Sequence, residues 1–144
     1  MIDNETTPPE PKSEADFNAL FCAEAGGEQE TRHNYTYGDG REGYVLVDCE
    51  TDTTVWEGGL DKRSSLDSLQ QALFAGLLTG KRPGIVIYDT DGAEGQYEFR
   101  IRMAAELAGV EYVSYDWQEG LQDDSEGAEA VMPEIDIADL FWGF

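Results

Sequence analysis

The sequence predicts an α/β fold in which a mixed five-stranded sheet is flanked by helices. Its first half holds short runs of β-forming residues between turns rich in Gly and Asp. From residue 64 onward, the spacing of apolar residues changes from every second position to a helical period. Helical stretches then alternate with two strand-like stretches, an order that produces right-handed β-α-β crossovers.

The first three strands are expected to be joined by short turns. Gly38, Asp39 and Gly40 supply the first turn, because Gly and Asp adopt the backbone conformations that tight turns require. Residues 50–52 supply the second turn. The strands themselves cover residues 33–37, 44–49 and 53–57. Successive strands with such short connections pair as an antiparallel meander.

The first helix is expected to begin after Ser64 and Ser65, which can cap its N-terminus, and to end at Gly80. Its leucines recur at helical spacing, so they form one stripe that we expect to be buried. The stripe consists of Leu66, Leu69, Leu73 and Leu77. Residues 85–88 then form a continuous apolar strand, which is typical of a strand covered on both faces.

The second helix is predicted over residues 96–108, with Glu98 and Arg102 paired at i, i+4 and Gly109 at its C-terminal end. A fifth strand follows at residues 111–117. This order completes the expected sheet of three antiparallel strands and two crossovers.

The chain is expected to divide into an N-terminal segment and one domain. Residues 1–30 contain three prolines, eight acidic residues and one lysine, a composition that favours a flexible, solvated segment. Within it, residues 17–23 are apolar enough for one or two helical turns that dock on the body. Residues 31–144 are expected to form a single domain, since roughly 100–200 residues organise around one core.

Acidic residues dominate the composition. There are 31 Asp and Glu against 9 Lys and Arg, which gives a net charge of −22. The 42 residues after Arg102 hold eleven acidic residues and no basic one. Nonspecific binding to nucleic acid relies on clustered Lys and Arg, and this chain has no such cluster. The acidity suits a high-salt environment, the imitation of a polyanion, or simply a soluble acidic protein.

Three features predict a cytoplasmic protein. The N-terminal residues lack the basic and apolar regions of a secretory signal. No apolar run approaches the roughly 18–20 residues that cross a bilayer, so no membrane partner is expected. Cys22 and Cys49 are too few for a disulfide framework or a zinc site, which fits a reducing compartment. The single histidine, His33, has no triad pattern around it and is expected to be structural.

Acidic residues after the 85–88 strand are the first candidates for a functional site. Asp89 and Asp91 directly follow this strand, a position where crossover sheets place ligand-binding residues. Two carboxylates there suit Mg²⁺, which prefers oxygen ligands, but the same stretch also fits a simple turn. Asp67, on the first turn of the first helix, either faces this edge or interacts with the helix dipole.

Several stretches resemble the ribonuclease H family. Residues 35–40 are similar to its first-strand signature of an aromatic residue, Thr, Asp and Gly. Residues 43–59 look like its second and third strands, and Asp67 takes the place of the acid on its first helix. Residues 87–91 resemble its fourth-strand motif, and residues 134–140 are similar to its final helix, which bears the last carboxylate.

This resemblance implies a ribonuclease H-like fold and a metal-dependent nucleic-acid hydrolase, with a catalytically degenerate member also compatible. In this family, two Mg²⁺ or Mn²⁺ ions about 4 Å apart activate water and stabilise the leaving oxygen. The catalytic acids implied by the resemblance are Asp39, Asp67, Asp89, Asp91 and Asp139. The implied metal ligands are Asp67, Asp89, Asp91 and Asp139. Asp89 and Asp91, taken with Asp48, also resemble a Toprim domain, whose acids bind Mg²⁺ as well.

The alternative function is an acidic mimic of nucleic acid. Such an inhibitor, of the phage-like anti-restriction or anti-CRISPR type, would occupy the nucleic-acid groove of a basic partner. The expected partner is therefore nucleic acid for an enzyme, or a basic nucleic-acid-binding protein for a mimic. The apolar C-terminal stretch either packs on the sheet or docks on a partner. Its docking residues would be Leu140, Phe141, Trp142 and Phe144.

Overall fold

The computed structural model describes residues 10–61 and 66–121. The strands are β1 (Glu28–Tyr37), β2 (Arg41–Glu50), β3 (Thr54–Leu60), β4 (Arg82–Tyr88) and β5 (Glu111–Tyr115). The helices are α1 (Glu14–Ala25), α2 (Leu66–Thr79) and α3 (Gln96–Ala108). Within these described ranges, no helix combines the length and the apolar character that crossing a membrane requires.

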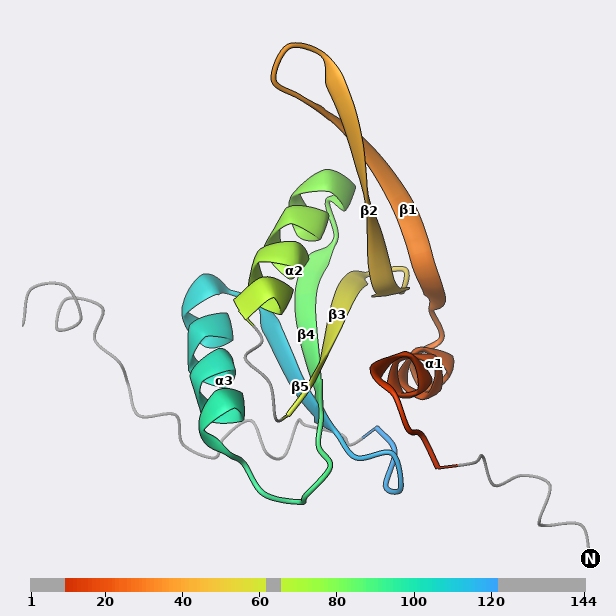
Figure 1. The fold of residues 1–144 in the computed structure, drawn as a ribbon, viewed down its shortest axis with the longest axis vertical. Coiled ribbons are helices and arrows are strands. Elements are labelled where there is room, and N and C mark those ends of the chain that lie inside the picture. The colour runs from red at the N-terminus through yellow and green to blue at the C-terminus, as the bar shows by residue number, and fades with distance from the viewer. Residues whose placement is uncertain (1–9, 62–65, 122–144) are drawn as a thin grey trace, which may run out of the picture.

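The five strands form one mixed sheet in the order β1-β2-β3-β4-β5. β1, β2 and β3 pair antiparallel, while β4 is parallel to β3 and β5 is parallel to β4. The predicted α/β class, with a mixed five-stranded sheet and flanking helices, is therefore confirmed. β3 joins the antiparallel half to the parallel half. The hairpin of β1 and β2 extends beyond the rest of the sheet (Figure 1).

The sheet lies between two helical layers (Figure 1). On one side, Phe17 and Phe21 of α1 pack with aromatic residues of the sheet, including Trp56, Tyr88 and Tyr115. On the other side, α2 covers β3 and β4, and α3 covers β5. This second core consists of Ala72, Ile85, Ile87, Ile101, Ala105 and Val110. Because β4 contributes to both cores, its continuous apolar sequence is explained by burial on both faces.

Helix α1 lies in the stretch that the sequence predicts to be flexible. Phe17, Phe21 and Cys22 are at most 6% exposed, and Gly26 ends the helix in the left-handed conformation, with φ 76°. The folded part therefore begins near residue 14, and the predicted boundary at residue 31 falls inside β1. Phe17, Phe21 and Cys22 of α1 are buried, while its acidic residues Asp16 and Glu24 are exposed and Glu14 is half-buried.

Cys22 of α1 and Cys49 of β2 form a disulfide, with their Cα atoms 5.5 Å apart. This corrects the expectation of two separate, reduced cysteines. Their separation of 27 residues carries no pairing signal in the sequence. The two side chains meet because α1 packs against the sheet beside β2.

Helix α2 contacts the sheet through alanines together with Leu69 and Phe74, whereas Leu73 and Leu77 face away from it. Ala72 and Ala75 are at most 2% exposed, whereas Leu73 and Leu77 are 41% and 79% exposed. The predicted burial of the leucine stripe is therefore wrong for these two residues. The sheet already presents large Val and Ile side chains, so the helix approaches it through alanines, which fill little of the interface. At Gly76, an added Cβ would lie 3.2 Å from the Pro83 ring.

Candidate metal centre

The carboxyl ends of β3 and β4 lie side by side, because the two strands are parallel and Leu60 pairs with Tyr88. The residues that follow, Asp61 and Asp89, therefore leave the sheet at the same edge. The Asp61 amide donates to the Tyr88 carbonyl at 3.2 Å, which extends the ladder by one bond. This edge of a crossover sheet is where ligands commonly bind.

Three carboxylates meet at this edge, and we call them the acidic cluster. One oxygen each of Asp61, Asp91 and Glu98 lies within 4.8 Å of the others. Asp61 and Glu98 are 5% and 3% exposed, while Asp91 is exposed. Oxygen ligands at about 2.1 Å from one Mg²⁺ lie at most about 4.2 Å apart. Small side-chain adjustments would thus bring all three oxygens to one ion.

Neighbouring groups hold the two buried carboxylates in place. Asp61 accepts hydrogen bonds from the Thr90 amide at 2.6 Å and from the Thr90 hydroxyl at 2.9 Å. Glu98 Oε1 accepts from the Gly95 amide at 2.7 Å, so this side chain also caps the start of α3. Both carboxylates are therefore oriented by the fold itself.

The electrostatic environment of this edge favours a bound cation. Burial raises the pKa of Glu98, and the charges of Asp89, Asp61 and Asp91 raise it further, against the lowering effect of the Gly95 hydrogen bond. Burial also raises the pKa of Asp89, against the hydrogen bonds from the Gly92 and Asp91 amides. Repulsion among partly buried carboxylates is what a divalent ion would relieve.

Of the acids predicted after β4, Asp91 belongs to the cluster and Asp89 shapes the turn that carries it. Asp89 Oδ1 accepts from the Asp91 amide at 3.2 Å and from the Gly92 amide at 2.9 Å. This stretch therefore forms a turn, through Asp89, and also contributes a carboxylate to the acidic cluster, through Asp91.

The other predicted acids lie elsewhere. Asp67 is exposed on the first turn of α2, and Asp39 is exposed in the turn between β1 and β2. Figure 1 shows that this turn is at the opposite end of the molecule from the carboxyl ends of β3 and β4. Asp139 lies outside the described residues. Within the described part of the chain, the acidic cluster contains neither Asp39 nor Asp67.

Asp61 and Glu98 were not among the predicted site residues. Asp61 follows β3 in the same way that Asp89 follows β4, but the strand predicted from the sequence covers only residues 53–57. In the structure, β3 continues through Gly58 and Gly59. A longer strand would have pointed to Asp61 by the rule that identified Asp89.

The sequence predicts an ion pair between Glu98 and Arg102. The structure shows Arg102 Nε donating to Glu94 Oε2 at 2.7 Å, while Glu98 caps Gly95. The available signal was the spacing of Gly95 and Glu98, because a Glu three residues after a helix start commonly caps the first turn.

A second pair of acids lies between β2 and β3, away from the cluster. Asp48 Oδ2 accepts from the Gly58 amide at 2.8 Å. Burial first, and then the charge of Asp48, raise the pKa of Glu57 to about 8. Burial likewise raises the pKa of Asp48. The two carboxyl groups therefore favour sharing a proton, which is typical of carboxyl groups in contact.

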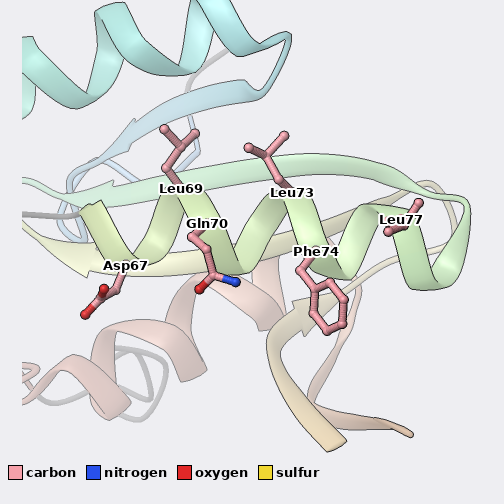
Figure 2. A pocket seen from close by; sticks show the side chains of 6 residues that line it. All are labelled: Asp67, Leu69, Gln70, Leu73, Phe74 and Leu77. Atoms are coloured by element: carbon pink, nitrogen blue, oxygen red, sulfur yellow. The ribbon is translucent and has the colours of Figure 1, made fainter. Parts of the chain in front are cut away.

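An apolar groove of about 640 Å³ follows the outer side of α2, and we call it the α2 groove (Figure 2). It is lined by Asp67, Leu69, Gln70, Leu73, Phe74 and Leu77. Figure 2 shows Leu69 and Leu73 on one side of the helix, Phe74 on the other, and Leu77 at the far end. Its walls are mainly apolar, so it suits an apolar occupant rather than an ion.

Comparison of the chain with protein-family models, with curated proteins and with solved structures gives no match. A functional assignment therefore depends on the acidic cluster and on the sequence.

Proposed function

We propose that the protein is a metal-dependent nucleic-acid hydrolase of the ribonuclease H type, with Mg²⁺ or Mn²⁺ held by the acidic cluster. The observation that supports this proposal is the meeting of three carboxylate oxygens within 4.8 Å at the carboxyl edge of β3 and β4. Hard divalent cations prefer such oxygen ligands. A bound ion would supply a water molecule of lowered pKa and positive charge for phosphate oxygens.

The protein's own residues have distinct parts in this proposal. Asp61 and Glu98 supply buried carboxylates that are oriented by Thr90 and Gly95. Asp91 supplies the solvent-exposed carboxylate of the acidic cluster, which an ion and a substrate could both reach. Because the chain carries a net charge of −22, a phosphodiester approaching the bare cluster would be repelled. The cation is thus needed for substrate binding as well as for chemistry.

Calorimetric titration with Mg²⁺ and Mn²⁺ tests the site directly. We expect the wild-type chain to bind, and the dissociation constant to rise at least about tenfold in Glu98→Gln and Asp61→Asn. Gln retains an oxygen that can accept from the Gly95 amide, so the cap of α3 is kept while the charge is removed. Asp39→Asn is the matched control, since it removes an acid at the hairpin turn.

Cleavage of an RNA–DNA hybrid tests the reaction. We expect cleavage that requires added Mg²⁺ or Mn²⁺, is abolished by a chelator, and is lost in Glu98→Gln but kept in Asp39→Asn. The absence of metal binding in the wild-type chain, or a loss of binding in Asp39→Asn equal to that in Glu98→Gln, would contradict the assigned site. Metal binding without cleavage at low or molar salt would contradict the hydrolase.

The acidic mimic is the second candidate, and the net charge of −22 is the observation that favours it. A mimic would bind a basic nucleic-acid-binding protein, compete with DNA or RNA for it, and be released as salt screens the charges. A chelator separates the two functions, because it would stop metal-dependent cleavage and leave binding of the mimic unchanged. Competition that persists in molar salt would argue against charge imitation.

A further inference from the structure

The α2 groove exposes a leucine face that the fold leaves uncovered in the described residues. Leu73 and Leu77 are 41% and 79% exposed, and they line the groove with Leu69 and Phe74. Charged or polar side chains normally occupy the outer side of a helix that packs on a sheet. Here the leucines line up along one helix, so the exposed area is contiguous and suits an apolar binding partner.

We infer that residues 137–144 of the same chain cover the α2 groove. Their large apolar residues recur at i, i+3, i+4 and i+7, the spacing with which an amphipathic helix fills an apolar groove. These residues are Ile137, Leu140, Phe141 and Phe144. A helix from Ile137 to Phe144 would be about 10 Å long. This length is close to the roughly 12 Å that separates positions 69 and 77 along the axis of α2.

The tether is long enough for this contact within one chain. Fifteen residues separate Leu121, the last described residue, from Ile137. Fully extended, they would reach about 50 Å, whereas a domain of this length has a radius of gyration near 15 Å. A tethered segment also has an effective concentration in the millimolar range for a short flexible linker.

Charge argues against a second copy as the occupant. Two chains that each carry a net charge of −22 repel one another, and association through an apolar face must overcome that repulsion. Residues 137–144 bring only one acidic residue, Asp139, with their apolar face. On helical spacing, Asp139 lies off the stripe formed by Ile137, Leu140 and Phe144.

Hydrogen exchange measured by mass spectrometry on the full chain tests this contact. In the wild-type protein, we expect amides of residues 137–144 to exchange at least about tenfold more slowly than in a synthetic peptide of residues 130–144. The double variant Leu73→Gln/Leu77→Gln should exchange as fast as the peptide. Leu107→Gln is the matched control, because Leu107 is 52% exposed on α3 and does not line the groove. It should keep the protection.

The amides of β4 report on global unfolding, so their exchange rates must be the same in all variants. A variant that loses protection only at residues 137–144 has then lost docking and not its fold. Peptide-like exchange of residues 137–144 in the wild-type chain would overturn the inference, as would protection that survives Leu73→Gln/Leu77→Gln. Protection that disappears on dilution, together with a dimer mass in light scattering, would assign the groove to a second copy and would equally overturn it.

Discussion

Glu50 shows how a single side chain ties the protruding hairpin to the body of the protein. Its Oε1 accepts from the Thr31 hydroxyl at 2.5 Å and lies 2.6 Å from His33 Nε2, while Lys81 Nζ donates to Oε2 at 2.8 Å. Burial alone would raise the pKa of Glu50, but the hydrogen bonds from Lys81, Thr31 and His33 lower it to about 2. The expectation that His33 is structural agrees with this contact.

Glu57 has the opposite electrostatic behaviour, because it is buried and lies beside the half-buried carboxyl group of Asp48. Its pKa is near 4.3 in an unfolded chain and about 8 in the fold. Between these values the folded protein binds more protons than the unfolded chain. Stability therefore falls as pH rises through this window.

We predict that the melting temperature of the wild-type protein decreases between about pH 5 and pH 8, measured by circular dichroism. Glu57→Gln removes the group that must lose its proton, so it should flatten this decrease and raise the melting temperature at pH 8. Glu42→Gln, at an exposed position of the hairpin, should follow the wild-type curve. A wild-type melting temperature that does not fall over this range would refute the shared-proton interpretation.

At the scale of elements, the disulfide Cys22–Cys49 fastens α1 to β2. The two cysteines are 27 residues apart in the sequence. A cross-link over this distance lowers the entropy of the unfolded chain, which stabilises the folded protein by about 3–4 kcal/mol. α1 also contributes Phe17 and Phe21 to the core, so helix packing and the covalent bond act on the same contact.

Reduction should therefore lower the free energy of unfolding by about 2–4 kcal/mol, measured by urea denaturation with and without a reducing agent. Cys22→Ala/Cys49→Ala should show the lowered stability under both conditions, because it has no bond to reduce. If the wild-type chain contains two free thiols by thiol titration after purification under air, the assigned bond is absent.

At the scale of the whole molecule, the net charge of −22 opposes the compact state. Salt screens this repulsion, because the Debye length falls from about 10 Å at 0.1 M salt to about 3 Å at 1 M salt. We expect the urea midpoint of unfolding to rise as NaCl increases from 0.05 M to 0.5 M. Sucrose, which strengthens burial without screening charge, serves as the control. A midpoint that does not change over this salt range would show that the acids are spaced too widely to repel.

The same charge decides what the acidic cluster can do. Most acids in the described part of the chain are exposed, and their number alone predicts no site. Asp61 and Glu98 differ because the fold buries them at one edge of the sheet and orients them through Thr90 and Gly95. It is this placement that separates a candidate metal centre from a merely acidic surface.

The sequence by itself determined the features that depend on neighbouring residues. Turn-forming glycines and aspartates marked the hairpin, and the helical period marked α2 and α3, because local backbone preferences and spacing are properties of short segments. The rule that acids follow the strands of a crossover sheet identified Asp91 as a candidate ligand.

Only the tertiary structure decided which surfaces and side chains meet. α2 has leucines on one face and alanines on another. The alanine face packs on the sheet because the large side chains of the strands leave room there only for small residues, so Leu73 and Leu77 face outward. Asp61 and Glu98 converge because β3 and β4 are parallel and α3 begins beside them. Such contacts depend on the rotation of a helix and on strand pairing across the chain, which local spacing does not encode.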